Sequence, residues 1–243
     1  MKTIKLEIDL DVTELLEITK YEIPDSHQQG NTKGSFPNFI SKTDETRIQG
    51  IQQILEELQG KPYYISQKID GSSTTQFYHP EDGFGVCSRK VEVVEGGNAY
   101  WEMAYKYNIK NWLKEHAIET GQYLAMQGEV AGPGIQGNRL GLEHHDLFVF
   151  NLFDIKTGNY LDYSELISIC QLFEWRTVPI LEAGDNFNYT FEELLLKAKG
   201  KYDSGRNQEG IVIRPQIEQT SRRLQGNRMS FKVINNDFLL EGK

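Results

Sequence analysis

Eight short segments of the chain have the composition and the patterning of polar and apolar residues that are typical of β-strands. They are residues 63–70, 72–79, 84–89, 123–131, 147–155, 177–182, 209–215 and 229–234. Helical spacing of apolar residues is found over 45–58, with Thr43-Asp44 as its expected cap, and further helices are expected over 98–118, 163–174 and 190–199. The strands come in clusters with helices between them, which indicates antiparallel sheets and not a regular strand–helix–strand series. The pattern therefore predicts an α+β fold.

The first part of the chain differs from the rest. Residues 1–20 are expected to form one strand followed by an irregular acidic segment, and residues 24–38 a polar loop that contains Gly and Pro. No obvious linker and no internal repeat follows. We therefore expect an N-terminal extension over residues 1–33 and one compact domain over residues 34–243.

The composition of the 243 residues, with 12 Tyr, 12 Phe and 3 Trp, is that of a folded protein. No run approaches the roughly 18 apolar residues of a membrane span, and the N-terminus does not resemble a signal peptide. Cys87 and Cys170 are the only cysteines, too few for a disulfide scaffold or a zinc cluster. The cytoplasm is therefore the expected location, with no membrane partner.

The net charge of −9 is unfavourable for binding a polyanion, but the charge is unevenly distributed. Residues 197–243 contain ten Lys and Arg against five Asp and Glu. A basic segment on an acidic body is compatible with phosphate binding at one surface. A solvated basic helix and loop explains the same charges equally well.

Lys68 lies at the end of an apolar strand and is followed by Asp70 and Gly71. Lysine becomes a nucleophile only when its pKa, about 10.4 in a free side chain, is lowered by burial or by a nearby cation. Asp70 points to the same side of an extended strand as Lys68 and has the chemistry to hold a metal or its water. Gly71 permits a sharp turn. A strand end at the surface, followed by a turn, is the simpler explanation of this pattern taken alone.

Two further carboxylates lie at strand ends beside glycines, namely Glu129 and Glu209. Together with Asp70 they offer oxygen ligands, which suit Mg²⁺ or Mn²⁺ bound partly through water. Such residues also occur as ordinary features of strand edges. The few histidines and the two isolated cysteines argue against zinc.

Two cations and two aromatic residues complete the candidate chemistry. Lys232 lies within an apolar strand and Arg89 at a strand end, so each needs an anionic partner, either a phosphate or a neighbouring carboxylate. Phe148 and Phe150 lie on one face of a strand. Such aromatic residues usually belong to the core, but either ring has the chemistry to stack on a purine.

Six segments of this kind occur in order along the chain. They are Lys68-Ile69-Asp70-Gly71, Ser88-Arg89, Gly128-Glu129, Phe150-Asn151-Leu152-Phe153-Asp154, Glu209-Gly210-Ile211-Val212 and Phe231-Lys232. Together they resemble the motifs of the covalent nucleotidyltransferase superfamily of ligases and capping enzymes. Residues 36–49 and 128–138 are further similar to the ATP-dependent RNA ligases of the Deinococcus and Naegleria type. The resemblance covers residues 34–240.

The resemblance implies an ATP-grasp-like nucleotidyltransferase domain of antiparallel sheets flanked by helices. It also implies an enzyme that forms a lysyl–AMP intermediate on Lys68, transfers AMP to an RNA 5′-phosphate and seals that end to a 3′-OH. ATP would be the substrate, Mg²⁺ or Mn²⁺ the cofactor, and RNA, in a nicked duplex, the partner. A DNA ligase, a GTP-using capping enzyme and a catalytically silent nucleotide- or RNA-binding module remain as alternatives.

The resemblance also assigns roles by position. The nucleotide-binding residues would be Gln67, Asp70, Arg89, Glu129, Phe150, Phe148, Glu209 and Lys232, with the metal near Asp70, Glu129 and Glu209. Arg47 and Gln49 would contact the terminal phosphate or the RNA 5′ end.

The chain departs from the family pattern in two places. The last motif often has two lysines one residue apart, and Ser230 takes the first place here. Residues 1–33 are too short for the oligonucleotide-binding domain that members of this branch often carry. The contacts to RNA are therefore expected from the basic region 197–232 or from a separate RNA-binding partner.

Overall fold

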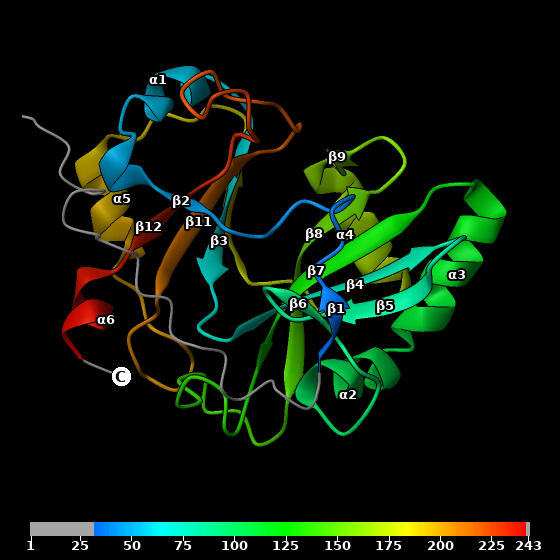
Figure 1. The fold of residues 1–243 in the computed structure, drawn as a ribbon. Coiled ribbons are helices and arrows are strands. Elements are labelled where there is room, and N and C mark those ends of the chain that lie inside the picture. Colours follow the sequence, from blue (N-terminus) through cyan, green and yellow to red (C-terminus); the bar gives the residue numbers. More distant parts are fainter. Residues whose placement is uncertain (1–31, 242–243) are drawn as a thin grey trace, which may run out of the picture. The chain divides into compact units, whose positions relative to one another are not determined.

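The structure, a computed structural model, describes residues 32–241. A seven-stranded sheet and a five-stranded sheet form its framework (Figure 1). The larger sheet has the order β1 (Thr32–Ser35), β6 (Val91–Val93), β5 (Gly83–Cys87), β4 (Ser72–His79), β7 (Leu124–Ala131), β8 (Asp146–Asp154) and β9 (Asn159–Tyr160). The smaller sheet has the order β10 (Ile180–Gly184), β3 (Tyr63–Lys68), β11 (Gly210–Pro215), β12 (Phe231–Ile234) and β2 (Thr46–Arg47).

Neighbouring strands are antiparallel throughout, except that β12 and β2 run parallel. The helices are η1 (Ile48–Gly50), α1 (Ile54–Leu58), α2 (Ala99–Lys106), α3 (Ile109–Thr120), α4 (Tyr163–Leu172), α5 (Phe191–Ala198) and α6 (Asn236–Leu240). The predicted α+β fold with antiparallel sheets and flanking helices is confirmed.

Each sheet buries one face against helices. In the smaller sheet, Ile65, Ile213 and Phe231 pack with side chains of α1 and α5 in one core cluster. In the larger sheet, the strands β7 and β8 form a second cluster with α3 and α4. Full burial of each such side chain contributes about 1.5–3 kcal/mol. Because side chains alternate along a strand, the next residues, such as Val212 and Lys232, point to the opposite face.

Most predicted elements agree with the structure, including the seven strands that coincide with β3, β4, β5, β7, β8, β11 and β12. The helix predicted over 190–199 is α5, and Thr190 caps it by accepting a hydrogen bond from the Glu193 amide at 3.2 Å. The predicted strand 177–182 begins later, as β10 at Ile180.

Two predicted helices are wrong in detail. Residues 45–58 do not form one helix, because Thr46 and Arg47 extend to pair with β12, and a 3₁₀ turn precedes the short α1. Thr43-Asp44 therefore caps no helix. The predicted helix 98–118 is divided into α2 and α3 at Asn108, whose φ of 50° is left-handed and breaks the helical hydrogen bonding.

The predicted loop 24–38 is also wrong in part, because β1 pairs with β6. The predicted N-terminal strand lies in residues 1–31, outside the described residues, and the expected domain boundary after residue 33 falls inside β1. Within residues 32–241, none of the helices is both long and apolar enough to cross a membrane.

Candidate active site

A cavity of about 500 Å³ is lined by residues of both sheets. The smaller sheet contributes Arg47, Ser66, Gln67, Lys68, Val212, Arg214, Lys232 and Ile234, and the larger sheet contributes Ser72, Ser73, Glu129 and Phe150. Nine of the eleven residues that the sequence predicts for the site line this cavity. Phe148 and Gln49 are the two that do not.

Strand alternation places three cations along the cavity face of the smaller sheet. Phe231 and Val233 belong to the core cluster below the sheet, so Lys232 between them faces the cavity. Arg47 is the register partner of Lys232. Burial, together with the charges of Lys68 and Arg47, lowers the pKa of Lys232. A half-buried cation beside two others is suited to bind an anion such as a phosphate.

Lys68 ends β3 and forms an ion pair with Glu209. Its Nζ lies 2.6 Å from Glu209 Oε2, and both side chains are about one-fifth exposed, at 21% and 19%. Glu209 immediately precedes Gly210, the register partner of Lys68. Gly210 has a φ of +152°, and a Cβ there would lie 2.1 Å from the Val233 carbonyl oxygen. The glycine therefore permits the close strand contact that brings Glu209 to the lysine.

Glu129 approaches the same cavity from β7, where it is the register partner of Ser73. Gly71, in the turn between β3 and β4, permits this close approach of Glu129. A Cβ at Gly71 would lie 2.5 Å from the Val130 carbonyl oxygen and 2.8 Å from Glu129 Cγ. Burial, opposed by the charge of Lys68 and reinforced by the neighbouring carboxylates, raises the pKa of Glu129 to about 8. The carboxyl group is therefore poised to ionise when positive charge is added to the cavity.

Asp70 also lines the cavity and pairs with Arg139, whose Nε lies 3.4 Å from Asp70 Oδ2. Within residues 32–241, no three His, Cys, Asp or Glu side chains are grouped so that they could hold a metal ion by themselves. Asp70, Glu129 and Glu209 nevertheless give the cavity the oxygen donors that a hard divalent cation prefers. The donor set fits such an ion if water or a bound phosphate completes its coordination.

The two phenylalanines have different positions. Phe150 lines the cavity, and the Arg214 guanidinium lies 5.9 Å from the centre of its ring. Phe148 is 2% exposed and packs in the core with Ile69 and Val178. Phe148 keeps regular register with Glu129 and does not line the cavity, whereas Phe150 lies at a bulge of β8 between Val149 and Asn151. The contact of Phe148 with the nucleotide stays a prediction.

The remaining predicted residues lie at the edges of the cavity. Arg89 forms an exposed ion pair with Asp44. The side-chain amide of Gln67 donates a hydrogen bond to Gln208 Oε1 at 2.7 Å. Gln49 is exposed in η1 and does not line the cavity. Its contact with the terminal phosphate or the RNA 5′ end stays a prediction.

The sequence prediction missed Arg214 and Glu45, which line the cavity as an ion pair. Arg214 Nη2 lies 2.7 Å from Glu45 Oε1, and the arginine side chain is only 2% exposed. Burial by itself would raise the pKa of Glu45, but the charges of Arg214 and Arg228 hold it below its usual value. A signal for Arg214 was present, because it is two residues from Val212 in a predicted strand and so shares the face of the cavity.

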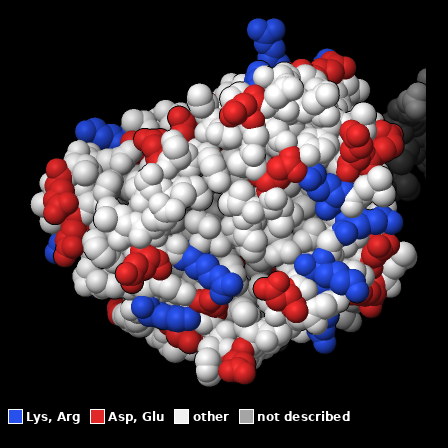
Figure 2. Space-filling model, turned by 180° about the vertical axis from the view of Figure 1, so that it is seen from behind, with Lys and Arg blue, Asp and Glu red and all other residues white. Residues whose placement is uncertain are grey.

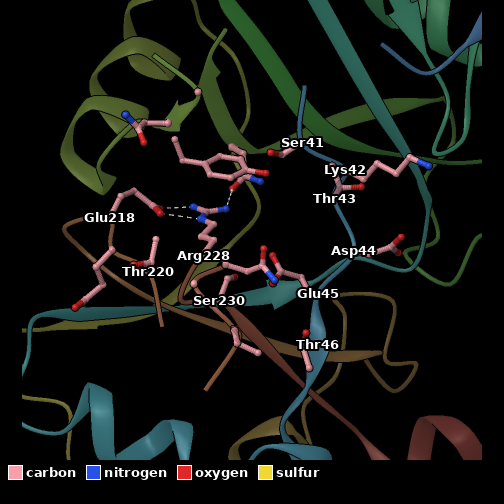
Figure 3. Close-up of a pocket in the computed structure, with 18 of the residues that line it drawn as sticks. Ser41, Lys42, Thr43, Asp44, Glu45, Thr46, Glu218, Thr220, Arg228 and Ser230 are labelled. Atoms are coloured by element: carbon pink, nitrogen blue, oxygen red, sulfur yellow. Dashed lines mark hydrogen bonds and ion pairs between the residues drawn. The ribbon is translucent and has the colours of Figure 1, made fainter. Parts of the chain in front are cut away.

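A second cavity, of about 980 Å³, shares the segment Thr43–Glu45 with the first (Figure 3). In Figure 3 this segment runs along one side, and Arg228 lies opposite with hydrogen bonds to Glu218 and to Asn151. Five carboxylates line this cavity, namely Asp44, Glu45, Asp162, Glu165 and Glu218, against the two cations Lys42 and Arg228. This excess of negative charge does not favour binding of the phosphate backbone of a nucleic acid in the second cavity.

On the face of the molecule seen in Figure 2, Lys and Arg are interspersed with Asp and Glu and form no separate basic patch. The ion pairs of the C-terminal region agree with this picture. Five of its cations are in ion pairs with carboxylates, namely Lys197, Lys199, Arg214, Arg223 and Arg228. Lys232 and Arg214 are the cations of this region that line the first cavity together with Lys68, and Arg214 is already paired with Glu45.

Comparisons with known proteins agree with this geometry. A sequence model of the family described as RNA ligase matches residues 61–234. A structure of a mutant RNA ligase from Naegleria gruberi with ATP and Mn is 34% identical, with a TM-score of 0.79, and the match covers 95% of this chain and 67% of that one. The N. gruberi enzyme with PPi is also 34% identical with a TM-score of 0.79, over 97% of this chain and 68% of that one. A comparison with curated proteins gave no match. The chain belongs to the RNA ligase family, which confirms the predicted family, fold and enzyme class.

Proposed function

We propose that the protein is an ATP-dependent RNA ligase that acts through a lysyl–AMP intermediate on Lys68. The observation that carries the proposal is the position of Lys68 in a cavity of two sheets, with Glu209 on its amine and the cations Lys232 and Arg47 beside it. N. gruberi RNA ligase has been observed with ATP and Mn and with AMP and Mn, which supports the same nucleotide here.

In the first step, Lys68 Nζ attacks the α-phosphorus of ATP. A P–N bond forms, the bond from that phosphorus to the bridging oxygen breaks, and pyrophosphate leaves. The amine must release its protons, and Glu209 already accepts a hydrogen bond from Nζ. Lys232 and Arg89 hold phosphate oxygens in this proposal, and Phe150 stacks on the adenine.

In the two later steps, an oxygen of the RNA 5′-phosphate displaces the lysine nitrogen from AMP, and a 3′-OH then attacks the activated 5′-phosphate and releases AMP. Arg47 is the residue that we propose for the 5′ end. A divalent cation, Mg²⁺ or Mn²⁺, would neutralise charge on the phosphates, held through water by Asp70, Glu129 and Glu209.

The substrate that we propose is RNA with a 5′-phosphate and a 3′-OH at a nick in a duplex. Many cations of residues 197–232 are already paired, so we assign part of the RNA binding to a separate partner. We propose the cytoplasm as the location, in keeping with two buried cysteines that form no disulfide.

The test is sealing of 5′-labelled nicked duplexes with RNA or DNA on each side of the nick, with ATP or GTP and with Mg²⁺ or Mn²⁺. We expect ATP to support sealing of an RNA nick. The Lys68→Ala variant should fail on this substrate but still seal an RNA whose 5′ end is already adenylated, because that substrate bypasses the lysine. Labelling of the protein by GTP alone, or equal sealing of both substrates by Lys68→Ala and the wild type, would contradict the proposal.

A further inference from the structure

One hydroxyl group connects the backbone of three residues, which are the proposed nucleophile and two of the carboxylates, on two segments of the chain. Tyr202 Oη donates a hydrogen bond to the Lys68 carbonyl oxygen at 2.7 Å. It accepts one from the Asp70 amide at 3.0 Å and another from the Glu209 amide at 3.1 Å. A phenol has one proton to donate and two lone pairs to accept with, so these three bonds use its full capacity.

This hydroxyl lies at the point where the regular pairing of β3 and β11 ends. Lys68 and Gly210 form the last register pair between β3 and β11. Beyond it the chain turns away at Asp70, so the hydroxyl takes the place of a strand partner for the three backbone groups. Burial raises the pKa of Tyr202, which keeps the hydroxyl protonated and able to donate.

The tyrosine is itself held firmly. It is 4% exposed and packs in a core cluster with Ile69 and Phe148. Its amide donates to the Arg206 carbonyl at 2.9 Å, inside a tight loop closed by a bridge between Lys201 and Asn207. Because packing and hydrogen bonds fix this side chain, its hydroxyl holds the backbone groups bonded to it in fixed positions.

We propose that Tyr202 is a positioning residue for the adenylation step. This proposal rests on the function proposed above. Tyr202 does not line the cavity. Its hydroxyl holds the backbone of Lys68, Asp70 and Glu209 as one unit, so that the amine and the two carboxylates keep their relative positions while the α-phosphate is attacked. Nucleotide contacts from Lys232, Arg89 and Phe150 do not depend on it.

The experiment measures single-turnover formation of lysyl–AMP by wild type, Tyr202→Phe and Tyr63→Phe over a range of ATP concentrations. Tyr63 is a matched control, because it is a 5%-exposed tyrosine in β3, the strand that ends at Lys68, and its hydroxyl bonds to Glu182 away from the cavity. We expect the rate of Tyr202→Phe at saturating ATP to fall by about 100-fold, the scale of a misplaced reacting group. Its half-saturating ATP concentration should stay within about threefold of the wild-type value, since binding contacts are intact.

The outcomes separate this proposal from the function on which it rests. If the wild type forms no lysyl–AMP, the proposed function fails. If the wild type is active and Tyr202→Phe matches it, or Tyr63→Phe loses the same activity, the positioning role is overturned. Should Tyr202→Phe not fold, fluorotyrosine at residue 202 keeps the ring and weakens the hydroxyl as an acceptor. The proposal then predicts a slower rate at an unchanged melting temperature, and an unchanged rate would overturn it.

Discussion

The ion pair of Glu45 and Arg214 connects the segment before β2 to β11, a strand that lines the first cavity. Arg214 Nε donates to Ser230 Oγ at 2.9 Å, and its guanidinium also bonds to the Phe150 carbonyl and to Glu45. Replacing Glu45 with alanine removes the single carboxylate of this group and leaves a guanidinium that is only 2% exposed. The arginine cannot escape this cost by losing its proton, because the pKa of arginine is above 12.

The expected loss of stability follows from that burial. Breaking a buried pair by removing one partner costs about 3–5 kcal/mol. In a domain of this size, each kcal/mol lowers the melting temperature by about 2–4 °C, so a decrease on the order of 10 °C is expected for Glu45→Ala. Urea denaturation and calorimetry measure both quantities. The double variant Glu45→Leu with Arg214→Met should recover much of the stability, because no charge is then left buried.

The neighbouring residue provides the control. Asp44 pairs with Arg89, but the two side chains are 57% and 62% exposed. Removing an exposed pair costs about 1 kcal/mol or less, so Asp44→Ala should unfold close to the wild type. The reasoning is refuted if Glu45→Ala loses no more stability than Asp44→Ala.

Three further predictions concern the cavity. Gly71→Ala should reduce lysyl–AMP formation at least about tenfold in a labelling assay, because its Cβ would lie 2.5 Å from the Val130 carbonyl oxygen. The control Gly96→Ala, whose Cβ would have nothing within 4 Å, should behave as wild type in the same assay. The affinity for Mn²⁺ should rise with pH up to about 8 and then level off, because binding must displace the proton of Glu129, whose pKa is raised to about 8. Calorimetric titrations in two buffers should show that proton release, Glu129→Gln should abolish it, and an affinity that is flat from pH 6 to pH 9 would count against the assignment. Lys232→Ala should lose adenylation by 100-fold or more, since a half-buried phosphate contact has no substitute, and a loss of only a fewfold at saturating ATP would remove Lys232 from the site.

The strands and the faces that line the cavity could be predicted because alternation is a local property. Lys232 between two apolar residues, and Lys68 at a strand end, could each be assigned to a face from the sequence alone. The helix over 45–58 was wrong because Thr46 and Arg47 gain a strand partner almost two hundred residues later, in β12. No local pattern contains that contact.

The residues that support the site were harder to predict than those that line it. Tyr202 and Arg139 lie in loops, and their roles depend on where two distant loops fold over Asp70. Phe148 and Phe150 are two residues apart in one strand, so alternation alone puts both on the same face. The bulge of β8 at Phe150 is a feature that alternation does not predict. Arg214 was missed as well, although strand alternation puts it on the same face of β11 as Val212, which lines the cavity.

The central claim is that Lys68 becomes covalently bonded to AMP. Intact-mass measurement of the purified protein after incubation with ATP and Mn²⁺, followed by peptide mapping, tests it most directly. We predict an increase equal to one AMP residue, located on Lys68, reversed by excess pyrophosphate and missing in Lys68→Ala. An unchanged mass in an intact and folded protein, or an adduct on any other residue, would contradict it.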